Sequence, residues 1–337
     1  MAPRIAAGYA GGEHHGRLPC RVSAISFPHG VIPAALLPFA ADLAIDEAEF
    51  RRHLGELAAT PGITAVTINA HSTEVASCSF EEQRRILAVA MEAIGERTPL
   101  VHGVYADGSI EAARIAAMAT AGGASALLVF PPGPFSLGQS AQMALAHFKR
   151  IAAASDLPII VFQYPLAGGQ GYPLETLLRL ADEVPTIRAI KDWSNSVPLH
   201  ERQIRVLQGR APPVNVLTTH SAWLLSSLVL GCSGLLSGMG SVVAGLQAEL
   251  FAAVRGNDLA RARALNDRLN PLAEIFYADP FIDMHNRMKE ALVLLGRIDR
   301  AVVRPPLVKL EMAEIARIAA ALEAAGFTLN RDRRDAA

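Results

Sequence analysis

The chain has 337 residues, 51% of them hydrophobic, and a formal net charge of −1. A charge this close to neutral provides no attraction to nucleic acid or to an anionic membrane, and no run of like charges suggests a binding tail. No stretch approaches the roughly 18 uninterrupted apolar residues of a membrane-spanning helix. The N-terminus also lacks the basic-then-apolar order of a signal peptide. We therefore expect small-molecule partners, with no nucleic acid and no membrane.

The chain has three cysteines, Cys20, Cys78 and Cys232. Their spacing does not fit metal ligands, and an odd count is typical of reduced cysteines in a protein of the cytoplasm. We expect a cytoplasmic location and no disulfide framework. No bound metal and no cofactor are expected.

Along the chain, residues 1–28 are rich in Gly and His and lack periodicity, so we expect a surface arm. After this arm, short apolar runs typical of β-strands alternate with segments of helical period. Residues 79–94 are predicted to form a helix that begins after Ser79, since Glu82 three residues later completes a capping-box pattern. The eight strand-like runs are 34–39, 63–69, 99–104, 125–130, 157–163, 187–191, 214–218 and 233–238.

Eight strand-like runs, each followed by a helical pattern, predict the α/β class and a (β/α)8 TIM barrel over residues 29–242. Residues 243–337 show only helical patterns, which predict the last barrel helix and a small C-terminal helical unit. A doubly wound open sheet is the competing fold. It is disfavoured because no Gly-rich phosphate-binding turn follows the first predicted strand.

Lys191 closes the sixth predicted strand and is one of only four lysines among 31 basic residues. A lysine amine can lose its proton when it is buried and can then form an imine, whereas Arg stays protonated. The structural alternative is a lysine whose apolar stem packs at the strand end while its ammonium reaches water.

Active sites of such barrels gather at the carboxyl ends of the strands. The segments there include "NAHSTEVAS", "FQYPLAGG", "IKDWS" and "GLLSGMG". Together with "GVIPAALLPF" and "MKEALVLLG", they resemble the dihydrodipicolinate synthase and N-acetylneuraminate lyase family of class I aldolases and dehydratases. The resemblance covers residues 29–310. It implies that Lys191 is the catalytic lysine, which forms a Schiff base with a 2-oxo acid.

The family's G-T-T-G-E turn, which holds the substrate carboxylate, is matched by Ala70–Glu74, "AHSTE". Ser72 falls on a hydroxyl position, with His71 and Thr73 on either side, so the resemblance implies that these three residues bind substrate. A strand-end turn without a ligand is the alternative, because the glycines that permit close backbone approach are missing. At the eighth strand, "GLLS" matches the family's "G-V-I-S" and implies that Leu236 and Ser237 lie beside the imine.

The fifth strand departs from the family pattern. Phe162 stands where the family has a proton-relaying Tyr, and Ala167 stands where it has a substrate-binding Arg. A phenyl ring cannot carry a proton. Tyr164, two residues on and on the same face of the strand, is the candidate catalytic hydroxyl, with a purely covering role as the alternative. Gln163 is a further candidate for substrate binding.

The tyrosine pair that the family shares across a dimer contact is also absent, because Pro131–Phe135 reads "PPGPF". Tyr105 is another hydroxyl near a strand end, where we expect a rim residue. The resemblance still implies a homotetramer. His71, His102 and His220 fall near strand ends and raise a metal-dependent alternative. It is disfavoured because no Asp or Glu completes the set at an obvious spacing and because a metal would duplicate the electron-sink role of the imine.

The expected function is that of a lyase that forms a Schiff base with a 2-oxo acid. Its reaction is expected to dehydrate or aldol-cleave a hydroxylated 2-oxo acid of the 2-keto-3-deoxy sugar acid type, because the altered fifth strand resembles family members that act on such acids. Two alternatives stay open. One is 4-hydroxy-tetrahydrodipicolinate synthase, and the other is a non-catalytic paralogue that binds a keto acid.

Overall fold

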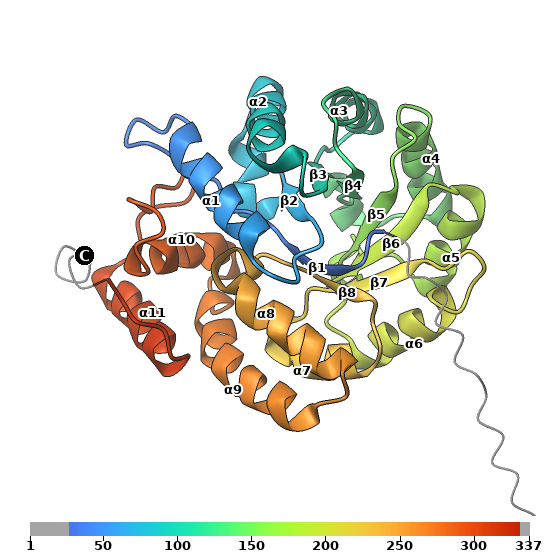
Figure 1. The fold of residues 1–337 in the computed structure, drawn as a ribbon. Coiled ribbons are helices and arrows are strands. Elements are labelled where there is room, and N and C mark those ends of the chain that lie inside the picture. Colours follow the sequence, from blue (N-terminus) through green and yellow to red (C-terminus); the bar gives the residue numbers. More distant parts are fainter. Residues whose placement is uncertain (1–26, 331–337) are drawn as a thin grey trace, which may run out of the picture.

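A computed structural model of the protein describes residues 27–330. Eight parallel strands form one sheet in the order β1-β8-β7-β6-β5-β4-β3-β2. Bridges from Val31 to Ile63 and from Ala34 to Thr67 join the two edge strands and close the barrel, as predicted (Figure 1). The strands are β1 Gly30–Pro33, β2 Val66–Ile68, β3 Leu100–Val104, β4 Ala126–Val129, β5 Ile159–Gln163, β6 Ile187–Asp192, β7 Asn215–Thr218 and β8 Gly234–Ser237.

Helices surround the strands, and a further group of helices follows at the C-terminal side (Figure 1). The barrel helices are α1 Glu47–Ala59, α2 Phe80–Ala90, α3 Ser109–Ala121, α4 Ala141–Ala152, α5 Leu174–Glu183, α6 Val197–Leu207, α7 Leu224–Val229 and α8 Gly240–Arg255. The C-terminal unit comprises α9 Leu259–Phe276, α10 Met284–Leu294 and α11 Met312–Ala324. In this unit, α9 packs against α8 and α11.

The predicted helix at residues 79–94 is confirmed as α2 and the π-helical turn Met91–Gly95 that continues it. The Ser79 hydroxyl accepts a hydrogen bond from the Glu82 amide at 3.1 Å, and the Ser79 amide donates to Glu82 Oε2 at 2.8 Å. This reciprocal pair satisfies amides that the first turn of a helix leaves without partners, so the capping pattern fixed the start of the helix.

The prediction of a strand at residues 34–39 is wrong. The first strand ends at Pro33, and the chain then runs as an irregular buried segment in which the Leu36 amide donates to Ser241 Oγ at 2.9 Å. Leu36 and Leu37 are at most 1% exposed. A short apolar run looks the same whether it forms a buried strand or a buried loop, so the pattern alone could not separate the two.

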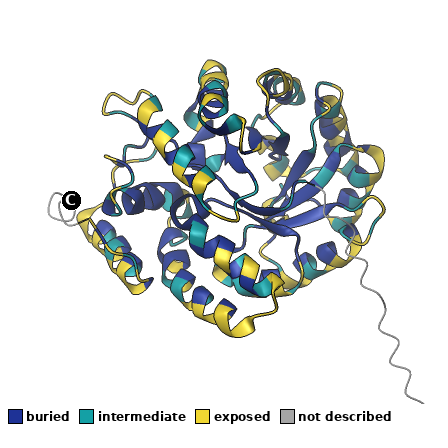
Figure 2. Cartoon of the chain, in the orientation of Figure 1, coloured by how far each residue is buried: buried dark blue, intermediate teal, exposed yellow. Residues whose placement is uncertain are grey.

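Side chains alternate between two cores along the strands. Figure 2 shows buried residues along the strands and exposed residues on the outer faces of the helices. On β6, Ile190 packs in the core between strands and helices, whereas Ala189 packs inside the barrel. Because strand side chains alternate, Lys191 shares the inward face of Ala189. The strand therefore places its amine at the carboxyl end of the barrel interior.

Residues 1–26 of the expected N-terminal arm lie outside the described residues, as does Cys20. Cys78 and Cys232 are buried free thiols. Across residues 27–330, no helix is long and apolar enough to cross a membrane. The boundary expected at residue 243 falls within α8, at a kink where Val243 has φ −126° and ψ 40°.

Candidate active site

Lys191 lies on β6 opposite Phe162 of β5 and is only 6% exposed. Its Nζ lies 3.9 Å from the centroid of the Phe162 ring. A ring face favours an ammonium by about 0.5–2 kcal/mol, but burial removes the much stronger hydration of that charge. Desolvation dominates and lowers the pKa of Lys191 from 10.5 to about 7. A substantial fraction of this amine is therefore neutral at pH 7 and able to attack a carbonyl.

Ser72 faces the same small cavity as Lys191, which has a volume of about 40 Å³. It lies in the short helical turn His71–Thr73 that follows β2, and it is 1% exposed. Its hydroxyl has no hydrogen-bond partner within residues 27–330. A buried polar group without a partner costs about 1–3 kcal/mol, so this hydroxyl is well suited to bind an oxygen of a ligand that enters the cavity.

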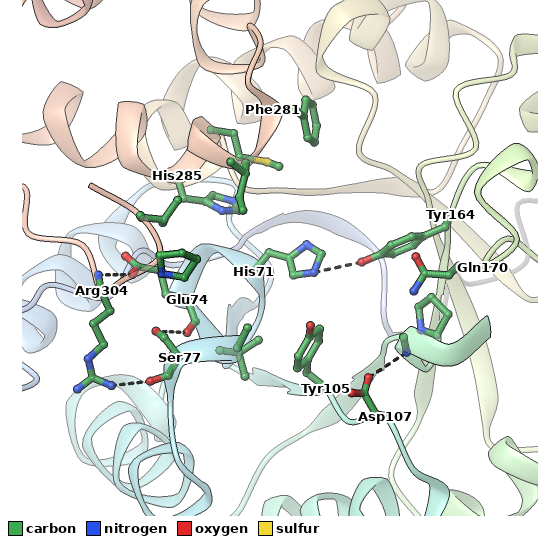
Figure 3. Close-up of a pocket in the computed structure, with 18 of the residues that line it drawn as sticks. His71, Glu74, Ser77, Tyr105, Asp107, Tyr164, Gln170, Phe281, His285 and Arg304 are labelled. Carbon is green, nitrogen blue, oxygen red and sulfur yellow. Dashed lines mark hydrogen bonds between the residues drawn. The ribbon is translucent and has the colours of Figure 1, made fainter. Parts of the chain in front are cut away.

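Tyr164 and His71 form a pair above this cavity, with the Tyr164 hydroxyl 3.1 Å from His71 Nε2 in a hydrogen bond (Figure 3). Burial, assisted by the charge of Lys191, lowers the pKa of His71 to about 3. Burial also raises the pKa of the Tyr164 hydroxyl above its ordinary value. At neutral pH the pair is thus an uncharged phenol bonded to an uncharged imidazole, which can pass a proton along its hydrogen bond.

Two residues expected to bind substrate have side chains engaged elsewhere. The Thr73 hydroxyl accepts from the Ala70 amide at 2.6 Å and donates to the Ala70 carbonyl at 2.8 Å, so it closes its own turn. The Gln163 side chain bonds both backbone groups of Tyr172 at 2.9 Å, on the opposite side of β5 from Phe162. Both side chains have structural partners, so contact of Thr73 or Gln163 with a substrate stays a prediction.

Leu236 and Ser237 end β8 and are buried, as expected for residues beside the barrel interior. The Ser237 hydroxyl accepts from Gln247 Nε2 at 3.2 Å. The next residue, Gly238, lines the small cavity with Lys191. Contact between Leu236 or Ser237 and a substrate stays a prediction.

Several residues of the site lie in segments to which the sequence argument assigned no role. Tyr277 follows α9, Phe281 precedes α10, and His285 lies on α10; all three line the small cavity, as does Trp193. His285 is 8% exposed, and burial together with the nearby His71 and Lys191 lowers its pKa well below the ordinary value. Only packing of the C-terminal helices over the barrel mouth brings Tyr277, Phe281 and His285 to Lys191, and no local pattern encodes that packing.

An outer cavity of about 560 Å³ opens above the small one. The two cavities share wall residues, among them His71, Trp193 and His285. Figure 3 shows the Tyr164–His71 pair projecting into the outer cavity, with His285 and Phe281 on one side and Tyr105 on the other. A substrate can therefore extend from Lys191 past this pair into a larger space.

The three histidines of the metal-dependent alternative do not form a common site. His102 Nε2 bonds the Asn69 amide group at 2.8 Å. His220 instead belongs to a buried cluster with Asp192 and His200, whose potential ligand atoms lie within 4.8 Å of one another. In this cluster, His200 Nδ1 forms a hydrogen bond with Asp192 at 2.6 Å, and His220 Nε2 accepts one from the Asn195 amide at 3.2 Å. These potential metal-ligand atoms are therefore already engaged in hydrogen bonds.

The sequence signature of the Dihydrodipicolinate synthetase family matches residues 27–325. The chain belongs to this family. It is 31% identical to the 4-hydroxy-tetrahydrodipicolinate synthase of Rhizobium meliloti, over 88% of this chain and 98% of that protein. It is 26% identical to the putative 2-dehydro-3-deoxy-D-gluconate aldolase YagE of Escherichia coli K12, over 82% of this chain and 90% of that protein.

Solved structures of the family share the fold. The crystal structure of Escherichia coli YagE in complex with pyruvate superposes with a TM-score of 0.82 at 25% identity, covering 90% of this chain and all of that one. Dihydrodipicolinate synthase from Aquifex aeolicus gives a TM-score of 0.81 at 22% identity. Membership in a family of synthases and aldolases makes the chain an enzyme of the class I aldolase and lyase type.

Proposed function

We propose that Lys191 forms a Schiff base with a 2-oxo acid and that the enzyme cleaves or dehydrates a hydroxylated 2-oxo acid. The observation that carries this proposal is the buried Lys191 amine, with its pKa lowered to about 7, in one small cavity with the unpartnered Ser72 hydroxyl. The amine is suited to attack the carbonyl and Ser72 to bind the carboxylate. The pyruvate in the YagE crystal structure supports a 2-oxo acid as ligand.

The chemistry begins when the neutral Lys191 amine adds to C2 of the acid and water leaves, which gives a protonated imine. In cleavage, a base takes the proton of the C4 hydroxyl, the C3–C4 bond breaks, and its electron pair moves to the imine as an enamine while an aldehyde departs. Protonation at C3 and hydrolysis by water then release pyruvate and the free lysine. In dehydration, a base instead takes a proton from C3 to give the enamine, and the C4 hydroxyl gains a proton and leaves as water. Hydrolysis of the resulting imine then releases the unsaturated 2-oxo acid and the free lysine.

We assign the proton transfers to the Tyr164 hydroxyl, which exchanges protons with His71 through their hydrogen bond. Their 3.1 Å hydrogen bond connects the end of β5 to the turn after β2, beside the path of a substrate bound to Lys191. Phe162, which replaces the family's Tyr, instead packs its ring against the lysine. The catalytic hydroxyl has in this proposal moved two residues along the strand, about 6.6 Å nearer the mouth.

This displacement favours a hydroxylated substrate over condensation with an aspartate-derived semialdehyde. The synthase activity named for the relatives from Salinibacter ruber and Rhizobium meliloti remains the second candidate. Against it, Phe162 and Ala167 stand where the family has its relaying Tyr and its Arg. Acids of the 2-keto-3-deoxy sugar type carry the C4 hydroxyl that both proposed reactions need, and YagE is named for such an acid.

A coupled assay tests this proposal by measuring pyruvate release from 4-hydroxy-2-oxo acids and, by absorbance, their dehydration. We expect turnover far above any dihydrodipicolinate formation. Tyr164→Phe should lower kcat by about 10²–10⁴-fold, the usual contribution of a positioned proton donor. Tyr172→Phe is the matched control, because the buried Tyr172 hydroxyl has no hydrogen-bond partner within residues 27–330.

Three results would contradict the proposal. Efficient dihydrodipicolinate synthesis would favour the synthase. An unchanged rate in Tyr164→Phe would remove the assigned role of the displaced hydroxyl. Absence of turnover with every acid would favour the non-catalytic paralogue.

A further inference from the structure

The walls of the outer cavity are mainly aromatic and aliphatic. Tyr105, Tyr164, Trp193, Phe281, Met284 and Leu307 line it. Trp193 and Phe281 stack with ring centroids 5.2 Å apart and an angle of 12° between their planes. Tyr164 meets Trp193 edge to face at 5.3 Å. These rings surround the space that a substrate group beyond C4 enters after it passes the Tyr164–His71 pair.

Two charged groups of the same walls, Glu74 and Arg304, already have partners. Glu74 forms a buried ion pair with Lys289 and accepts the Arg304 amide at 3.0 Å. The Arg304 guanidinium bonds Glu82 at 2.6 Å and the Leu43 carbonyl at 2.8 Å, which uses its donors away from the cavity. Neither charge is therefore free to bind a ligand.

Three further polar side chains of the walls each form one hydrogen bond with the backbone. The Ser77 hydroxyl donates to the Glu74 carbonyl at 2.8 Å. Asp107 accepts the Gly133 amide at 3.1 Å, and Gln170 donates to the Pro132 carbonyl at 3.4 Å. A polyol chain placed against the aromatic part of the wall would lose water and meet few polar partners there, and each buried hydroxyl left unpaired costs about 1–3 kcal/mol.

For an aromatic group, the gain from contact with this wall exceeds the loss of hydration. It loses little hydration, buries apolar area worth about 25 cal/mol per Å², and gains about 0.5–1.5 kcal/mol for each well-oriented ring contact. The volume of about 560 Å³ lies within the range of pockets that enclose small organic ligands.

We propose that the natural substrate carries an aromatic or other apolar group beyond C4, as in a 4-aryl-4-hydroxy-2-oxobutanoate, in place of the polyol tail of a sugar acid. This inference rests on the proposed function, since the acid end is held at Lys191. Cleavage of such an acid breaks its C3–C4 bond and releases an aryl aldehyde and pyruvate.

The test compares two acids that share the reacting carbons and differ in the tail: 4-hydroxy-2-oxo-4-phenylbutanoate and 2-keto-3-deoxygluconate. Lactate dehydrogenase reports pyruvate from both, and borohydride trapping of pyruvate on the wild-type enzyme is measured separately. We expect kcat/KM to be at least tenfold higher for the phenyl acid. Tyr105→Ala should lower this ratio, and Tyr105→Phe should preserve it.

The outcomes separate the two proposals. Trapping at Lys191 with equal or better turnover of the sugar acid overturns the apolar-tail inference and leaves the Schiff-base function standing. Trapping without turnover of the phenyl acid overturns the inference as well. Failure to trap any 2-oxo acid on the wild-type enzyme overturns both.

Discussion

The reactivity of Lys191 depends on the neutral fraction of its amine, which the surrounding apolar side chains set. Burial lowers its pKa to about 7, whereas a solvated lysine titrates near 10.4. The sequence predicted the position of this amine, because strand alternation and the family motif both point to it. It did not predict the pairing of Tyr164 with His71, because that contact joins the ends of β2 and β5 across the barrel.

This shift predicts the pH dependence of imine formation. The ammonium predominates below pH 7 and cannot attack a carbonyl, so the rate of pyruvate trapping should fall tenfold per pH unit on the acid side. Above pH 7 the rate should level off, since the folded-state pKa is depressed and the amine is already neutral. The measurement is the initial rate of borohydride-trapped adduct from pH 5 to 10. A rate that keeps rising to pH 10 would show a solvated lysine.

At the scale of elements, an ion pair joins the turn that carries His71 and Ser72 to α10. Lys289 is fully buried on α10, and it donates to Glu74 and to the Val302 carbonyl at 2.8 Å. Glu74 itself has a left-handed backbone with φ 50°. The pair therefore fixes the barrel mouth against the C-terminal helices that supply His285.

Lys289→Met should destabilise the fold by about 3–5 kcal/mol, because it leaves the Glu74 carboxylate buried without its cation. Lys149→Met is the matched control, since Lys149 pairs with Glu183 at the surface with its side chain 51% exposed. Such exposed pairs contribute about 0–1 kcal/mol. Urea denaturation measures both changes. Equal effects of the two substitutions would show that the buried pair does not hold the mouth together.

Element predictions succeeded where a local signal exists and failed where packing decides. The cap at Ser79 marked α2, and seven predicted runs contain their strand to within one residue. The first strand was misplaced because residues Ala34–Phe39 are apolar and buried but lie in a loop, and a buried loop has the same sequence pattern as a buried strand. The contribution of α10 to the site was not predicted, because its sequence indicates a helix but not the elements against which that helix packs.

At the scale of the whole molecule, the eight-unit pattern and the ordered motifs sufficed for the barrel and the family. The apolar character of the outer cavity could not be predicted from the sequence, because its walls come from segments spread between His71 and Leu307. The homotetramer implied by the resemblance stays a prediction. So do the substrate contacts of Leu236 and Ser237.

The central claim, imine formation at Lys191, can be tested on the whole chain because it contains only four lysines. Incubation with pyruvate and borohydride, followed by peptide mass spectrometry, should show one reduced adduct per chain on Lys191. Lys191→Arg should abolish it while leaving the fold intact, since Arg keeps the charge but cannot form an imine. An adduct on Lys149, Lys289 or Lys309, or one that persists in Lys191→Arg, would contradict the account.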